Sequence, residues 1–161
     1  MDVSPAQAVV GLVLAVRLVE FWISRRNAEL RMAEGAEEIG GELHLAIAMF
    51  HAVWLAALAF LAEGAARLDP TWLAAAIALL ALRGYRLSRG TPGWSLRLFK
   101  DRPPPGAEAR LRRFMRDPCY VPMLAELLVV PLVFGLWWLS LAGTGLYAAL
   151  AWRRLAVEGL R

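Results

Sequence analysis

The sequence predicts an all-α membrane protein, a single domain over residues 1–161 in which about five apolar helices cross a bilayer as a bundle. Its composition is 59% hydrophobic with a mean hydropathy of +0.49, whereas soluble domains contain about 45–50% apolar residues. Several apolar stretches approach the length of about 20 residues that a spanning helix needs. The basic residues gather between alternate stretches, as they do when loops lie on two sides of a membrane.

The first three candidate spans are separated by clear polar breaks. Residues 6–23 form the first, and because no basic segment of the kind found in cleaved signal peptides precedes it, we expect it to be retained. Residues 43–62 form the second, whose polar content is two histidines. Residues 71–85 form a shorter third span, which crosses only if Arg83 and Arg86 extend toward the lipid headgroups.

The last two candidate spans, residues 120–139 and 140–156, have no firm turn signal between them. Glycines at positions 135, 143 and 145 are the breaks that the region offers. A hairpin is the favoured interpretation, and one long helix kinked at Pro131 is the alternative.

Charge placement predicts the orientation of these spans. With five spans, the loop near Asn27, the region from Arg83 to Arg116 that contains the loop of residues 86–119, and the C-terminus share one side, and of the 18 Lys and Arg residues all but Arg17 and Arg67 fall there. The positive-inside rule then predicts an outside N-terminus and a cytoplasmic C-terminus in the cytoplasmic membrane. Because topology explains the basic residues, the net charge of +4 does not indicate a nucleic-acid partner. The single cysteine, Cys119, excludes an intrachain disulfide.

Ionisable residues inside spans are costly and usually functional, so they are the candidate site residues. Arg17, Glu20, Ser24 and Asn27 share one face of the first predicted helix. We interpret Arg17, Glu20 and Asn27 of this stripe as substrate-binding. The alternative is an ion pair between Arg17 and Glu20 that satisfies itself, although burial in lipid would demand further partners.

The second and fourth predicted spans also contain polar residues. His44 and His51 lie about 10 Å apart along the second helix, too far apart to chelate one metal, so no metal site is predicted. Each histidine is expected to donate a hydrogen bond to a neighbouring helix, with His51 the candidate for substrate binding. Glu126 is isolated among apolar residues, so it must be protonated, paired with an arginine or bonded to a ligand.

The last helix carries a polar face made of Thr144, Tyr147, Arg154 and Glu158. Together with the stripe of the first helix and Glu126, it predicts a polar cavity that opens to the cytoplasm. A transporter is disfavoured because the chain shows no internal repeat.

The residues resemble the isoprenylcysteine carboxyl methyltransferase family, in particular a bacterial branch of it. The C-terminal part of the resemblance is carried by Arg116-Asp117-Pro118-Cys119-Tyr120, Glu126, Pro131-Leu132, Arg154 and Glu158. The N-terminal part is carried by Arg17, Glu20, Ser24-Arg25-Arg26-Asn27, Gly35, Glu37 and His51. The resemblance implies a membrane enzyme that uses S-adenosylmethionine, with Arg116, Pro118, Tyr120, Arg154 and Glu158 holding the cofactor. It also implies a lipidic methyl acceptor, isoprenylcysteine-like or alkylpyrone-like, at a site facing the cytoplasm among membrane lipids.

Two positions depart from the family motif. Asp117 stands where the motif has histidine, and Gly159 stands where it has a second glutamate. An aspartate would repel the carboxylate of the cofactor. The alternative prediction is therefore a catalytically degenerate protein that keeps the scaffold to bind a lipid or a partner.

The chemistry of methyl transfer needs few groups, because positioning supplies much of the acceleration. A carboxylate acceptor is already nucleophilic and needs a cation, for which Arg154 or Arg17 would serve. A hydroxyl acceptor also needs a base, for which Glu20, Glu126 or His51 are candidates. Arg154, Glu126 and Glu20 are accordingly the predicted catalytic residues, and Arg17, Glu20, Asn27 and His51 the predicted substrate-binding residues.

Overall fold

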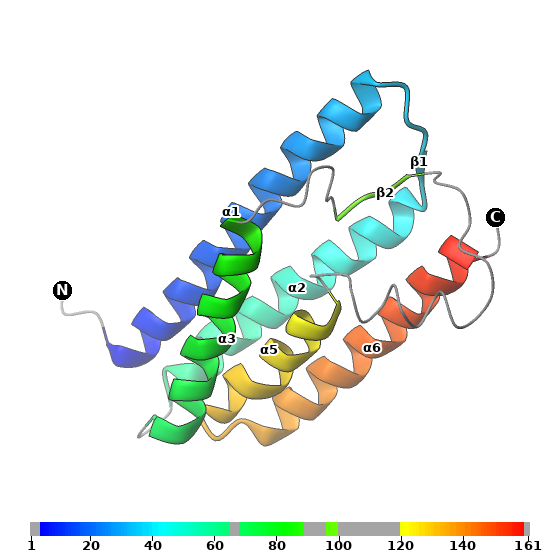
Figure 1. Ribbon diagram of the computed structural model, residues 1–161. Coiled ribbons are helices and arrows are strands. Elements are labelled where there is room, and N and C mark those ends of the chain that lie inside the picture. Colours follow the sequence, from blue (N-terminus) through cyan, green and yellow to red (C-terminus); the bar gives the residue numbers. More distant parts are fainter. Residues whose placement is uncertain (1–3, 65–67, 89–95, 100–119, 160–161) are drawn as a thin grey trace.

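The computed structural model describes residues 4–64, 68–88, 96–99 and 120–159, and this part of the chain is helical, as predicted. It contains five helices, which are α1 (Pro5–Ala33), α2 (Gly41–Ala62), α3 (Pro70–Ser88), α5 (Tyr120–Leu132) and α6 (Trp137–Gly159). Successive helices run in opposite directions along one bundle (Figure 1). Two short strands that the sequence did not predict, β1 (Glu38–Ile39) and β2 (Leu98–Phe99), pair in antiparallel fashion at one end of it.

Helix α1 begins and ends at local sequence signals. Ser4 accepts a hydrogen bond from the backbone N–H of Gln7, whose side chain accepts one from the backbone of Ser4 in return. The helix continues beyond the predicted apolar span to Ala33 and stops at Gly35, whose φ of 89° suits glycine. The N–H of Ala36 then donates to the carbonyl of Arg31, which satisfies the helix end.

Residues 120–159 form a hairpin, so the alternative of one long kinked helix is wrong. The break lies at residues 133–136, and the predicted boundary between residues 139 and 140 is wrong as well. Gly135, with a φ of 71°, ends α5 in the same way that Gly35 ends α1, and the N–H of Leu136 donates to the carbonyl of Pro131. Ser140 also donates from its hydroxyl to the carbonyl of Leu128, which ties the start of α6 to α5.

The connections gather at two ends of the bundle (Figure 1). At one end the N–H of Asp69, before α3, donates to the carbonyl of Val133 over 2.9 Å. At the other end Leu96 donates from its N–H to the hydroxyl of Ser24 over 2.7 Å, and Arg97 pairs with Glu38 over 2.9 Å. We call these the Asp69 end and the β1–β2 end.

Helices α2 and α6 pack antiparallel at close range. Tyr147 lies against Phe50 and His51, with ring centroids 6.2 and 5.4 Å away. About one turn farther toward the Asp69 end, Gly143 lies directly under the indole of Trp54. Glycine permits this approach because it carries no Cβ.

We expect Gly143→Ala to lower the free energy of unfolding by about 1–3 kcal/mol, the usual cost of overpacking. A Cβ there would lie 2.6 Å from Nε1 of Trp54, a residue that is only 4% exposed. Denaturant titration in detergent micelles measures the change. Gly145→Ala is the matched control, because a Cβ at that position meets nothing within 4 Å. Equal destabilisation of both variants would contradict the close approach.

The distribution of side chains is the reverse of that in a soluble bundle. Large apolar side chains on the outside of the helices are more than half exposed, including Leu18, Trp22, Val53, Phe60, Leu146 and Trp152. Charged side chains are buried inside, as described below. Among the described residues, α1 and α2 are long and apolar enough to cross a membrane, and α3 and α5 contain shorter apolar segments.

Candidate functional site

Four charged side chains from three helices form a closed ring inside the bundle. Arg17 donates to Glu20 over 3.0 Å and to Glu126, and Arg83 donates to the same two carboxylates. Arg83 bonds Glu20 through both Nε and Nη2, the latter over 2.6 Å, and bonds Glu126 over 2.9 Å. Positive and negative groups therefore alternate around the ring, and its net charge is zero. We call these four residues the charge ring.

The charge ring is almost fully removed from the surface. The exposed fraction of the four side chains is 9% for Arg17, 3% for Glu20, 2% for Arg83 and 1% for Glu126. Burying a single one of these charges would be very costly, and only mutual pairing with good geometry offsets that cost. The ring thus joins α1, α3 and α5 through contacts that each depend on the others.

Arg83 is the member that sequence reasoning missed. The prediction that it extends toward the headgroups is wrong, because its side chain points into the bundle. Two signals could have found it. It follows Ala76 and Leu80 at helical spacing, and both of those residues are buried. In addition, the formal charges of Arg17, Glu20 and Glu126 add up to one negative charge. A buried site with that net charge needs another cation to neutralise it.

The predicted stripe on α1 faces inward. Glu20 and Ser24 are each 3% exposed, and Asn27 is half-buried one turn farther along. The Arg17–Glu20 ion pair exists, and it has the additional partners that burial demands. Glu126 is paired with arginines, which was one of the three possibilities open to it. All four carboxylate oxygens of Glu20 and Glu126 are occupied by arginine donors.

His51 lies on α2 next to the charge ring. Its Nδ1 lies 2.7 Å from the carbonyl oxygen of Ile47 in its own helix, and its Nε2 lies 3.0 Å from Sδ of Met123 in α5. The same sulfur lies 3.8 Å from Nη1 of Arg83. His51 thus contacts a backbone carbonyl of its own helix through one nitrogen and a thioether of a neighbouring helix through the other. No cluster of three or more His, Cys, Asp or Glu side chains that could hold a metal occurs among the described residues.

Tyr120 and Arg154 meet toward the β1–β2 end. The guanidinium of Arg154 lies 5.5 Å from the centre of the Tyr120 ring, and the two side chains are 7% and 1% exposed. Tyr120 is the first residue of α5, and Arg154 lies in the last third of α6. His44, in the first turns of α2, is close enough to Arg154 and Arg97 for their charges to act on its ring. The hairpin thus brings together two residues that are 34 positions apart in the chain.

The remaining predicted cofactor residues lie outside the described part. Arg116 and Pro118 fall in residues 100–119, as does Asp117. Glu158 belongs to α6, but its side chain is not described, and Gly159 is the last residue of that helix. The other members of the polar face on α6 point inward as predicted, with Tyr147 3% exposed.

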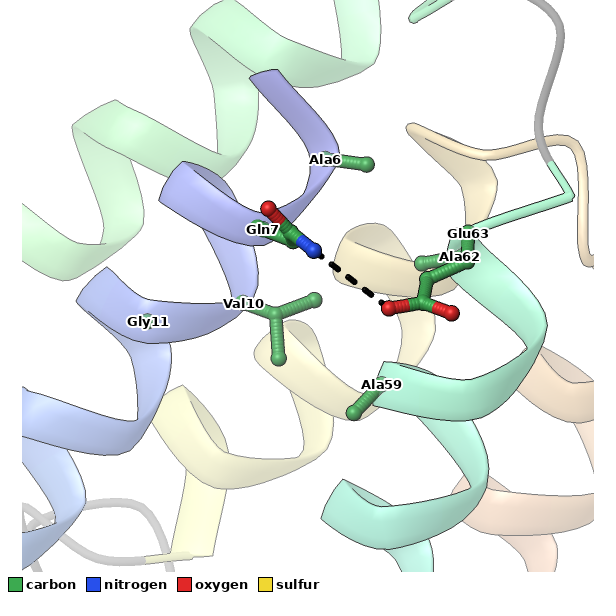
Figure 2. A pocket seen from close by; sticks show the side chains of 7 residues that line it. All are labelled: Ala6, Gln7, Val10, Gly11, Ala59, Ala62 and Glu63. Atoms are coloured by element: carbon green, nitrogen blue, oxygen red, sulfur yellow. Dashed lines mark hydrogen bonds between the residues drawn. The ribbon is translucent and has the colours of Figure 1, made fainter. Parts of the chain in front are cut away.

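A groove of about 210 Å³ lies between the first half of α1 and the end of α2 (Figure 2). Small and apolar side chains line it, and Gln7 donates to Glu63 across it over 3.4 Å. It belongs to the Asp69 end, far along the bundle from Tyr120 and Arg154. Where the charge ring lies, the side chains contact one another directly.

Comparison of the chain with family models, with curated proteins and with solved structures gives no match.

Proposed function

We propose that this chain is an S-adenosylmethionine-dependent membrane methyltransferase, similar to the isoprenylcysteine carboxyl methyltransferase family, that acts on a lipidic acceptor. The observation that carries the proposal is the buried contact between Arg154 and Tyr120 at the β1–β2 end. Both residues belong to the motif on which the family resemblance rests. A fold that brings them together, with a cation held inside an apolar bundle, supports a site for a charged ligand.

The membrane part of the proposal is supported by the reversed distribution of side chains. A bundle in water would be destabilised if it exposed side chains such as Val53 and Phe60 while it buried four charges. In a bilayer the same arrangement is favourable, because lipid solvates the outer face and the charges meet inside. Helices that alternate in direction between two ends support five crossings. The clustering of basic residues in the sequence supports a cytoplasmic β1–β2 end.

The described residues fit part of the cofactor. Arg154 offers the cation that a carboxylate requires, and the Tyr120 ring over which it lies holds it in place. When bound, the cofactor supplies a methyl group on a positively charged sulfur. The protein then has to hold and orient the acceptor and exclude water, which an apolar bundle does.

The contacts within the charge ring indicate which of the predicted catalytic residues have a structural role instead. Every oxygen of Glu20 and Glu126 accepts from a guanidinium group, so both carboxylates are engaged in holding the ring together. Arg17 is likewise engaged by both carboxylates. We therefore propose that the ring positions α1, α3 and α5, and that Arg154 on α6 is the cation that meets a cofactor or acceptor carboxylate.

Calorimetric titration of the detergent-purified protein with S-adenosylhomocysteine tests the cofactor. We expect Arg154→Met to weaken binding about 10- to 100-fold, the loss of a hydrogen bond to a charged group. Arg153→Met is the matched control, because Arg153 is the neighbouring residue on α6 and is exposed. Glu158→Ala tests the other motif residue of this helix. Folded wild-type protein that does not bind would contradict the proposal.

That negative result would favour a second candidate, a scaffold that binds a lipid or a partner without catalysis. The observation in its favour is the charge ring itself, whose charges satisfy one another without a ligand. Asp117 and Gly159, which depart from the motif, favour it as well.

A further inference from the structure

The groove between α1 and α2 at the Asp69 end has a polar rim and an apolar wall (Figure 2). The rim consists of Gln7, in the first turn of α1, and Glu63, which directly follows the last residue of α2. The amide of Gln7 donates to the carboxylate of Glu63 over 3.4 Å. One turn farther along the bundle, the wall contains Val10 and Gly11 on α1 and Ala59 on α2. The groove therefore changes from polar to apolar along the helix axes.

Small side chains leave this groove open. Apart from Val10, its wall consists of alanine and glycine, at positions 6, 11, 59 and 62. Figure 2 shows the side chains of Val10 and Ala59 pointing into the space between the two helices. Gly11 and Ala59 are exposed, and a Cβ built on Gly11 would meet nothing within 4 Å. The groove is thus accessible from the outside of the bundle, where lipid surrounds a membrane protein.

The acyl chain of a lipid suits this groove better than water does. An unfilled apolar groove loses dispersion contacts along its walls, and its apolar wall offers water no hydrogen bonds. A lipid also has the same order of polarity as the groove. Its headgroup lies at the membrane surface, as the rim does, and its chains run toward the middle of the bilayer.

The charge of the rim indicates the class of headgroup. Glu63 carries a carboxylate, and the carbonyl groups at the C-terminal end of α2 add partial negative charge beside it. The last turn of α2 contains no basic residue that would offset these charges. The 3.4 Å bond from Gln7 is long, so the exposed carboxylate can accept a shorter and stronger one. A primary ammonium group supplies a positive charge and three N–H donors, whereas a trimethylammonium group has no N–H to donate.

We propose that this groove binds a phospholipid with a primary ammonium headgroup, of the phosphatidylethanolamine class. One acyl chain packs against Val10, Gly11 and Ala59, and the ammonium group donates to Glu63. The bound lipid contacts α1 and α2 together and so joins these helices at the Asp69 end. The inference does not depend on the proposed function, because Arg154 and Tyr120 lie toward the other end of the bundle.

Native mass spectrometry of the detergent-purified protein tests the headgroup. The probes are a phosphatidylethanolamine and a phosphatidylcholine with the same acyl chains. We expect the wild-type protein to bind one phosphatidylethanolamine about fivefold more tightly than phosphatidylcholine, the scale of one exposed ion pair. Glu63→Gln keeps the shape of the side chain without its charge, so this variant should bind the two lipids equally. Equal affinities in the wild-type protein, or an unchanged preference in Glu63→Gln, would overturn the proposal.

Gly11→Leu tests the location of the lipid in the same experiment. The Cβ has open space around it, so the leucine side chain can occupy the groove, and we expect the bound phosphatidylethanolamine to be lost. Ala59→Leu fills the groove from its other wall if Gly11→Leu does not fold. Gly145→Leu is the matched control on α6, because it is also an exposed glycine whose Cβ meets nothing within 4 Å, and it should retain the lipid.

Two further outcomes would assign the groove differently. A folded Gly11→Leu or Ala59→Leu protein that binds phosphatidylethanolamine with wild-type affinity would place the lipid elsewhere on the surface. A wild-type dimer that binds no lipid, and that Gly11→Leu converts to a monomer, would assign the groove to a second copy of the chain. Either result overturns the proposal.

Discussion

Arg83→Met is expected to lower the free energy of unfolding by about 3–5 kcal/mol, the typical cost of removing one partner from a buried ion pair. The substitution leaves Glu20 and Glu126 with Arg17 as their shared partner, so one negative charge inside the bundle is no longer compensated. Methionine fills much of the volume of arginine, so the change reports mainly on charge. Denaturant titration in detergent micelles, followed by circular dichroism, measures it.

Two variants control this experiment. Arg25→Met removes an arginine from an ion pair with Glu29 whose side chains are more than half exposed, and such pairs contribute at most about 1 kcal/mol. The double variant Arg83→Met with Glu126→Gln restores neutrality, so it should be more stable than Arg83→Met alone. The single variant Glu126→Gln is measured as well. If the double variant is destabilised by the sum of the effects of Arg83→Met and Glu126→Gln, the charges of the ring do not compensate one another.

Val53→Arg is expected to disfavour membrane insertion of α2 by about 2.5–3.5 kcal/mol, the apparent cost of an arginine at the centre of a spanning helix. Val53 lies near the middle of Gly41–Ala62 and is 65% exposed, so it contacts no partner inside the bundle that could neutralise the new charge. On a soluble protein the same exposed position would tolerate arginine within about 0.5 kcal/mol. The fraction of protein that resists alkaline extraction from membranes measures the effect.

Glu42→Arg is the matched control on the same helix. Glu42 is exposed in the first turn of α2, at the β1–β2 end, where an arginine would lie among headgroups. We expect it to leave insertion unchanged. Val53→Arg protein that remains folded and monomeric in water would contradict a membrane location for α2.

The sequence was sufficient to predict that the chain is helical and which side of α1 faces inward. Helical spacing places Arg17, Glu20 and Ser24 on one face whatever the neighbours are, and the cost of burying Glu126 without a partner required an arginine beside it. Both inferences depend on properties of one helix or one side chain. Apolar segments of sufficient length likewise follow from composition alone, as α1 and α2 confirm.

The tertiary structure decided how the helices meet. Periodicity ranks faces within a helix, but it does not specify the rotation or height of one helix against another, because those depend on packing over long sequence separations. Arg83 could thus have extended to the headgroups, and only the packing of α3 against α5 and α1 turns it onto Glu20 and Glu126. The contact of Arg154 with Tyr120 likewise depends on the α5–α6 turn ending at Gly135 rather than a few residues later. The contact of His51 with Met123 depends on how α2 and α5 are placed in the bundle by the helices between them, which no local pattern in the sequence encodes.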